Sequence, residues 1–336
     1  MQSRPLALLA LSALFITACH SPTAPDSSLV RPVTPGGHPQ DTTQQYDTGG
    51  VVERLRVPGG ARPFAIALSA SGTALVTLLD GGKLARAELS NGAFDRTIAV
   101  GATPSDVAFN STGTRAYVTN QFGGSISIVD VAANQAIGTI AEVGDPWRVR
   151  VAPGDSILWA TNNAGGIFAY RLATGQLIAT LYAAAPVNGL AIAQQHAWFS
   201  ALDGTVQEVD TRTYRITRTF ALGGYLQDVV LSPDGRQLYV ADETGKVQFL
   251  DLTSGIVTTT IALPGGGGFA MALSDDGDDL YVSTGYYTRK VWVIDPPERR
   301  IEHVINTGGV PRRMVIDRSG EGAIVANEDG FVDIIR

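Results

Sequence analysis

A sequence repeat of about forty residues occurs in seven copies along this 336-residue chain. Each copy has an apolar run, a polar turn that often contains glycine, a second apolar run, another glycine, and a third apolar run that often ends in aspartate. One position aligns all copies: Ser69, Asn110, Ala152, Ala193, Ser232, Ser274 and Asp317. The spacings are 41, 42, 41, 39, 42 and 43 residues. So regular a period indicates one supersecondary unit repeated seven times.

Each copy is predicted to contain four short β-strands. In the second copy, apolar residues alternate along residues 106–109, 115–120, 125–130 and 136–140, which gives each strand one buried face. Gly113 lies in the turn between the first two strands, where a positive φ angle favours glycine. Four-stranded units repeated about every 40–45 residues are typical of propellers. The sequence therefore predicts an all-β fold, a seven-bladed β-propeller.

The two ends of the repeat region complement each other. The seventh copy stops after a third strand at residues 331–336, and an additional strand at residues 51–57 precedes the first full copy. We expect this N-terminal strand to pair with the last blade and close the ring, which removes two open sheet edges. The propeller domain is then residues 51–336.

The second apolar strand carries a resemblance to a known family. Tyr117-Val118-Thr119-Asn120 spells the name of the YVTN family of β-propeller repeats, which the chain resembles over about residues 51–336. Variants of the phrase occupy the same column at residues 159–162, 239–242, 281–284 and 324–327. Copies one and four, at residues 75–78 and 197–200, keep the apolar character and lose the Asn. The resemblance implies the propeller fold, and the departures put any shared ligand role of this column in doubt.

The N-terminus has the features of an export signal. Arg4 precedes an apolar run at residues 6–16, which is shorter than the roughly 20 residues that a membrane span needs. Ile16-Thr17-Ala18-Cys19 resembles a bacterial lipobox. The resemblance implies that residues 1–18 are a lipoprotein signal peptide and that Cys19 is lipidated. An ordinary signal peptide with an unmodified cysteine is the alternative.

Residues 19–50 have the composition of a tether, with five prolines after Cys19, many Ser, Thr and Gln, and almost no periodic apolar pattern. We expect a disordered linker after the lipidated Cys19. Acyl chains would hold the protein on a membrane, since each buried CH₂ contributes about 0.8 kcal/mol. His20 stands where an aspartate is associated with inner-membrane retention, which favours the outer membrane of a bacterial cell envelope. Periplasmic and surface-exposed orientations both stay open.

Composition narrows the range of partners. The formal net charge is −7, so no broad positive surface is available for nucleic acid. Cys19 is the single cysteine, so the fold does not depend on an intramolecular disulfide. We expect a monomer that interacts with the membrane through its lipid.

Ligands of propellers usually bind at the face formed by the loops that enter the innermost strands and the loops that join the second and third strands. On this architectural analogy we expect a binding site at that mouth. The candidate ligand-binding residues are Arg62, Asp106, Phe122, Trp147, Arg148, Tyr225, Asp228, Phe269, Tyr286, Tyr287, Arg312 and Arg313. Arginine and aromatic side chains together suit a protein, a glycan or a small anionic ligand.

One column of the repeat brings acids and bases toward the central channel. It consists of Ala65, Asp106, Arg148, Gly189, Asp228, Ala270 and Arg313. One interpretation is that Asp106 pairs with Arg148 of the next blade and holds the ring together, since buried charges are normally paired. The other is that the column binds a ligand.

Residues for catalysis are scarce. His196 and His303 are the two histidines after the linker and belong to different repeats, which predicts no metal site and no histidine base. Residues 274–279 are rich in aspartate, but they align with the turn at residues 232–235 and are predicted to be a turn. The repeats contain no Gly-x-Ser-x-Gly motif and no cysteine. We expect no catalytic residue and no cofactor.

Two functions stay open on these grounds. The first is a noncatalytic lipoprotein of the cell envelope whose propeller acts as a binding or interaction module. The second is a propeller enzyme of the lactonase or lyase type, because related seven-bladed propellers include such enzymes. A haem- or quinone-dependent propeller is disfavoured, since the chain has no Cys-x-x-Cys-His motif.

Overall fold

A computed structural model describes residues 49–89, 92–141, 143–193, 195–320 and 322–336. The predicted signal peptide, Cys19 and the linker up to residue 48 lie outside the described residues. Within the described part, no helix is long and apolar enough to cross a membrane.

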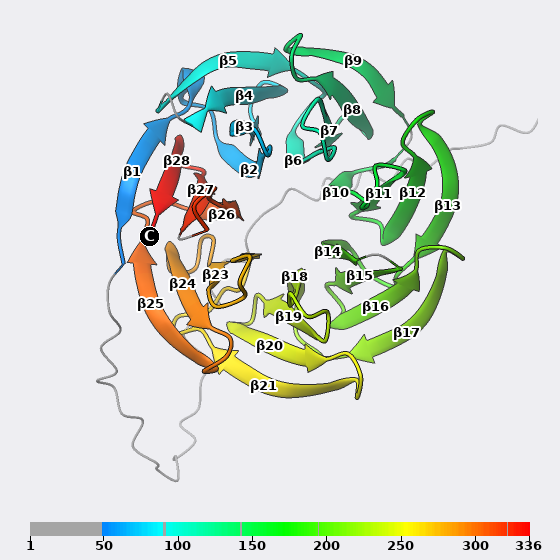
Figure 1. Ribbon diagram of the computed structural model, residues 1–336, viewed down its shortest axis with the longest axis vertical. Helices are drawn as coiled ribbons and strands as arrows, with labels where there is room; N and C mark the ends of the chain where they lie inside the picture. Colours follow the sequence, from blue (N-terminus) through cyan, green and yellow to red (C-terminus); the bar gives the residue numbers. More distant parts are fainter. Residues whose placement is uncertain (1–48, 90–91, 142, 194, 321) are drawn as a thin grey trace, which may run out of the picture. The chain divides into compact units, whose positions relative to one another are not determined.

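Seven four-stranded antiparallel sheets, the blades, surround a central axis (Figure 1). Blade 1 consists of β2 (Pro63–Leu68), β3 (Thr73–Leu78), β4 (Lys83–Glu88) and β5 (Ala93–Ala99). Blade 2 consists of β6 (Pro104–Phe109), β7 (Arg115–Asn120), β8 (Ser125–Asp130) and β9 (Gln135–Ile140). Blade 3 consists of β10 (Pro146–Val151), β11 (Ile157–Asn162), β12 (Gly166–Arg171) and β13 (Gln176–Tyr182). Blade 4 consists of β14 (Val187–Ala193), β15 (His196–Ala201), β16 (Thr205–Asp210) and β17 (Arg215–Ala221).

The remaining blades repeat the same order from the axis outward. Blade 5 consists of β18 (Leu226–Leu231), β19 (Gln237–Asp242), β20 (Lys246–Asp251) and β21 (Ile256–Ala262). Blade 6 consists of β22 (Ala270–Leu273), β23 (Leu280–Ser283), β24 (Lys290–Asp295) and β25 (Arg300–Asn306). Blade 7 consists of β26 (Pro311–Ile316), β27 (Ala323–Asn327), β28 (Phe331–Ile335) and, as its outermost strand, β1 (Val51–Arg56). A short 3₁₀ helix, η2 (Pro58–Gly60), follows β1.

The predicted closure of the ring is confirmed. β1 pairs antiparallel with β28, and Leu55 lies opposite Val332 in the register. The Arg54 side chain adds an ion pair to Asp333, with 2.6 Å between Nε and Oδ1. The all-β, seven-bladed fold is likewise confirmed, and in blade 2 the innermost strand begins only two residues before the predicted start.

The core lies between the blades. Seven hydrophobic clusters are described, and each joins two neighbouring blades around the ring. Between blades 1 and 2, for example, Leu75 and Leu84 pack with Val107 and Val118. The alternation of apolar residues along each strand therefore serves two interfaces, because both faces of a blade are covered.

The antiparallel order gives the ring two faces. The mouth face carries the loops between successive blades and the turns between second and third strands, which in blade 2 are residues 100–103 and 121–124. The hairpin face carries the other turns, which in blade 2 are residues 110–114 and 131–134. Each innermost strand therefore runs from the mouth face to the hairpin face.

Candidate functional site in the central channel

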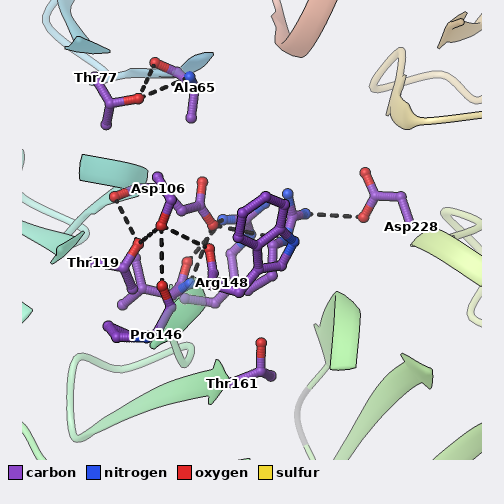
Figure 2. A network of polar contacts seen from close by, with 12 residues as sticks. Ala65, Thr77, Asp106, Thr119, Pro146, Arg148, Thr161 and Asp228 are labelled. Atoms are coloured by element: carbon purple, nitrogen blue, oxygen red, sulfur yellow. Dashed lines mark hydrogen bonds and ion pairs between the residues drawn. The ribbon is translucent and has the colours of Figure 1, made fainter. Parts of the chain in front are cut away.

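The innermost strands share a β-bulge that supplies the channel with side chains. The register slips between Pro104 and Asp106 in β6, and the same slip occurs in the other innermost strands except β22. A bulge leaves one extra residue in a strand and redirects side chains. Hydroxyl groups hold the distorted backbone: the amide of Ala65 donates to Thr77 Oγ1 at 2.8 Å, and Thr119 Oγ1 lies 3.3 Å from the Asp106 carbonyl oxygen (Figure 2).

Two consecutive tiers of side chains result. The upper tier, nearer the mouth face, is Phe64, Ser105, Trp147, Asn188, Gln227, Phe269 and Arg312. The lower tier is the column predicted from the repeat: Ala65, Asp106, Arg148, Gly189, Asp228, Ala270 and Arg313.

Aromatic rings of the upper tier meet across the axis and, with Arg312, form what we call the plug: Phe64, Trp147, Phe269 and Arg312. The Phe64 ring lies 5.4 Å from the Trp147 ring and 6.0 Å from the Phe269 ring, both edge to face. The Arg312 guanidinium lies 4.8 Å from the Phe269 ring and 5.3 Å from the Phe64 ring. Its Nε donates to Glu328 at 2.7 Å. The plug fills the mouth end of the channel.

The lower tier forms a buried charge network (Figure 2). Arg148 Nη2 donates to Asp228 Oδ1 at 2.9 Å, although Asp228 belongs to the second blade beyond. Gly189 of the intervening blade makes this reach possible, since a Cβ there would lie 2.9 Å from the Asp228 Cα. Asp228 also accepts the amide protons of Val229 and Met271. Burial raises the pKa of Asp228 and lowers that of Arg148, while their ion pair opposes both shifts.

Asp106 was expected to pair with Arg148 of the neighbouring blade, but Arg150 of the same blade lies closer to it. Its Oδ2 lies 3.7 Å from Arg148 Nε but 2.9 Å from Arg150 Nη1. The same oxygen accepts the amide proton of Val149 at 3.1 Å. The ring-stabilising interpretation thus describes part of the network, because Asp106 joins blades 2 and 3 while Arg148 and Asp228 join blades 3 and 5.

Arg313 is the exception in this tier. Its side chain is 5% exposed, and among the described residues no carboxylate lies within ion-pair distance of it. Its guanidinium lies 5.6 Å from the Phe64 ring and 5.3 Å from the Trp147 ring. Its Nε is buried without a hydrogen-bond partner. Within the part of the chain that the structure describes, Arg313 is therefore a buried cation without a counter-ion.

A cavity of about 470 Å³ lies below the plug. Its floor is formed by Asp106, Arg148, Asp228 and Arg313, its walls include Ile66, Val107, Met271 and Met314, and its rim is formed by hairpin turns at residues 69–70, 110–111 and 153–155. Among the described residues, none of the mouth loops lines it. The cavity consequently opens toward the hairpin face, opposite to the predicted mouth.

The other predicted site residues lie on the mouth face outside the channel. Arg62 is exposed and forms a bidentate pair with Asp80, with both N–O distances 3.0 Å, which raises the pKa of Arg62. Tyr286 stacks on Arg312 and donates its hydroxyl to Glu328. The other rim residues are Phe122, Tyr225 and Tyr287. The twelve predicted residues therefore form a channel floor, a plug and an outer rim rather than one pocket.

Sequence reasoning missed three contributors. Phe64 lies in the same register as Trp147, so extending the repeat alignment by one position would have found it. Arg150 follows Arg148 by two residues along β10 and therefore shares its face. Glu328, the partner of Arg312, directly follows the aligned Asn327.

Two asparagines of the repeat column bind backbone atoms of the connections between blades. Asn120 Oδ1 accepts the amide proton of Gly101 at 3.0 Å, and Asn162 Nδ2 donates to the Val143 carbonyl at 3.0 Å. In both cases the bond fixes the chain segment that enters the blade. The doubt about a shared ligand role is thereby answered for these two positions, which clamp the connections between blades.

The aspartate-rich segment is a turn, as predicted. Ser274 Oγ donates to Asp276 at 2.6 Å, and Ser232 Oγ donates to Asp234 at the same distance in the aligned turn. Across the described ranges no group of three His, Cys, Asp or Glu residues is arranged to hold a metal ion.

No family model matches this chain, and no curated protein matches it either. Among solved structures, the chain is similar to hydrazine synthase of Kuenenia stuttgartiensis, with a TM-score of 0.74 and 18% sequence identity. The match covers 89% of this chain and 99% of that chain. At this identity the similarity extends to the fold alone. The fold and the channel together define the class as a seven-bladed β-propeller whose channel is plugged at the mouth.

Proposed function

We propose that this chain is a lipid-anchored protein of the bacterial cell envelope whose propeller binds another protein at its mouth face, without catalysis. One observation carries the proposal. All exposed aromatic side chains of the described residues lie at the mouth face: Phe122, Tyr182, Tyr225, Tyr286 and Tyr287, which are 48% to 68% exposed. Exposed aromatic residues gathered on one face are characteristic of interaction surfaces.

The form of this surface favours a protein over a small molecule. Four of the five aromatic residues lie in mouth loops and Tyr182 ends β13, so they are spread around the ring from blade 2 to blade 6 instead of enclosing one pocket. Glycines surround them, including Gly223 and Gly224 before Tyr225 and the run at residues 265–268. Tyrosine on glycine-rich loops gives large contact area with adaptable backbone, as in antibody-type binding loops.

The path of the chain suits such a role. β1 runs from the hairpin face to the mouth face, because its C-terminal end leads into β2 through a mouth loop. At its start, the amide of Gly50 donates to the Arg336 carbonyl at 3.0 Å. A linker that joins the propeller at Gly50 is attached at the hairpin face. The proposed binding surface is then on the face of the propeller opposite to Gly50.

The enzyme alternative gains little from the channel. A lactonase or lyase needs a free acid or base, and Asp106 and Asp228 are both engaged in ion pairs and backbone hydrogen bonds. Asp242 is not among the residues that line the cavity. Its carboxylate accepts the amide protons of Tyr225 and Thr244.

The proposal is tested by site-specific photo-crosslinking of the full chain in intact cells of its own host. A benzophenone amino acid replaces Phe122 or Tyr182 on the mouth face, and Ile137 or Ile256, exposed on outer strands, as matched controls. We expect a discrete protein adduct from the mouth positions and none from the controls. Tyr225→Ala should reduce the adduct at least tenfold, since an aromatic hot spot contributes about 2 kcal/mol or more.

Two further results complete this test. An adduct whose added mass is removed by glycan-cleaving enzymes would replace the protein partner by a glycan. Equal labelling from both sets of positions would refute a dedicated face. Cys19→Ser should move the chain from the membrane pellet to the soluble fraction, and persistence in the pellet would rule out the lipid anchor.

A further inference from the structure

We propose that the central channel is a second binding site, which takes a small monocarboxylate with an apolar body through the hairpin face and pairs it with Arg313. This site is separate from the protein-binding surface of the mouth face. The plug lies between the two, and the cavity has no mouth-loop residue in its lining.

The charged side chains around the cavity floor leave one guanidinium group without a carboxylate partner among the described residues. A carboxylate at the rim, Asp155, is hydrogen-bonded to Ser111. The floor and its margin carry three guanidinium groups, from Arg148, Arg150 and Arg313, and two carboxylates, from Asp106 and Asp228. Both carboxylates are committed to Arg148 and Arg150 at 2.9 Å. One positive charge is left over, and it belongs to the buried Arg313.

Leaving the buried Arg313 guanidinium unpaired is unfavourable in free energy. Taking a cation out of water is unfavourable unless an anion or hydrogen-bond acceptors replace the lost hydration. Arg313 has two aromatic rings as neighbours and a buried Nε without a partner. Aromatic faces attract a cation but accept no guanidinium fork, whereas a carboxylate matches that fork with two parallel hydrogen bonds.

The charges of the floor and the apolar walls of the cavity define the chemical class of the ligand. A single negative charge balances the floor, while a more highly charged anion would be repelled by Asp106 and Asp228. Ile66, Val107, Met271 and Met314 line the walls and suit an apolar body, with the methionines able to adapt to its shape. A cavity of about 470 Å³ is within the usual range of small-molecule sites.

A ligand can reach the cavity from the hairpin face. Ala70, Ser111 and Gly154 lie at the rim in hairpin turns, and all three are exposed. The rim also carries Asp155, which is half-buried and accepts hydrogen bonds from the amide and hydroxyl of Ser111. The ligand therefore passes small side chains at the hairpin face before it meets the charged floor.

The site is tested by calorimetric titration of the full chain with hexanoate, with hexanamide, hexylammonium and inorganic phosphate as comparisons. We expect hexanoate alone to bind measurably. Arg313→Gln should weaken hexanoate binding at least tenfold. Arg62→Gln is the matched control because it removes an exposed arginine from the mouth face, and it should leave the affinity unchanged.

Access is tested by stopped-flow tryptophan fluorescence, since the Trp147 ring lies 5.3 Å from the Arg313 guanidinium. Ala70→Phe at the hairpin rim should slow hexanoate association at least fivefold, and Ala102→Phe on the mouth face should not. The Ala70→Phe and Ala102→Phe variants leave the charged residues of the floor unchanged, so they test the site even if Arg313→Gln does not fold. No binding of hexanoate to the wild type, equal binding of hexanamide or phosphate, or equal slowing by both phenylalanine variants would each overturn the proposal. None of these results depends on the mouth-face crosslinks.

Discussion

At the scale of single residues, the repeated asparagine holds successive blades in place. Asn162 is almost fully buried and uses both ends of its amide group. Its Nδ2 donates to the Val143 carbonyl, and its Oδ1 accepts the amide protons of Ala164 and Gly166 at 3.0 and 2.7 Å. One side chain thereby fixes both the segment that enters the blade and the turn that follows β11.

We expect Asn162→Ala to lower the free energy of unfolding by about 2–3 kcal/mol, because three buried backbone groups lose their partner. Urea denaturation followed by circular dichroism measures the change. Asn306→Ala is the control, since Asn306 is exposed at the end of β25, and it should stay within about 0.5 kcal/mol of wild type. Equal effects of the two substitutions would show that the amide does not act as a clamp.

The repeat alignment predicted which residues share a column, but not what each column does. It placed Arg148 beside Asp106 correctly, since both lie in the lower tier. It could not show that Arg148 reaches Asp228 past Gly189, because that distance depends on the diameter of the channel. It also could not show that Arg313 lacks a counter-ion, since a missing partner is visible only after all neighbours are in place.

At the scale of strands, alternation of apolar residues was a reliable guide and local distortion was not. The strands of blade 2 were predicted to within two residues, because each is bounded by turn residues that the repeat shows seven times. The bulges near Asp106 and Arg148 escaped prediction, since a bulge is defined by the register with the next strand. That omission is why neither the plug nor the cavity on the hairpin side of the charged tier was predicted.

The closing pair of strands offers a matched test of burial. Val332 of β28 is fully buried against Val57 and Ile66, whereas Val52 of β1 is 60% exposed. We expect Val332→Asp to destabilise the fold by more than about 4 kcal/mol, because it buries an unpaired charge at the ring closure. Val52→Asp should change stability by less than about 0.5 kcal/mol. Thermal unfolding measured by circular dichroism compares them, and similar melting temperatures would contradict the role assigned to β28.

At the scale of the whole molecule, buried tyrosines distributed around the ring link its stability to alkaline pH. Burial raises the pKa of Tyr170 to about 12, and it also raises the pKa of Tyr117, Tyr239 and Tyr281. The unfolded chain ionises these phenols near pH 10, so it releases protons that the folded chain retains.

Stability should therefore fall as the pH rises from about 10 to 12, by up to about 1.4 kcal/mol per pH unit for each tyrosine involved. Urea midpoints across this range, with phenolate absorbance recorded in parallel, measure the effect. Tyr170→Phe should lessen the slope, whereas Tyr182→Phe, at an exposed phenol, should not. A midpoint independent of pH up to 12 would contradict the burial of these phenols.

Ring closure by β1 also sets the order in which the chain can fold. Arg54 and Asp333, joined by an ion pair, are 279 residues apart in sequence. During synthesis, β1 is made before any complete blade, whereas its partner β28 is made only after all strands of blades 1 to 6. Six blades can assemble while β1 and β27 still present open edges, which are the parts of a sheet most prone to wrong pairing. The long loop that must close makes this final docking a slow step, so those edges stay unpaired until β28 has been made.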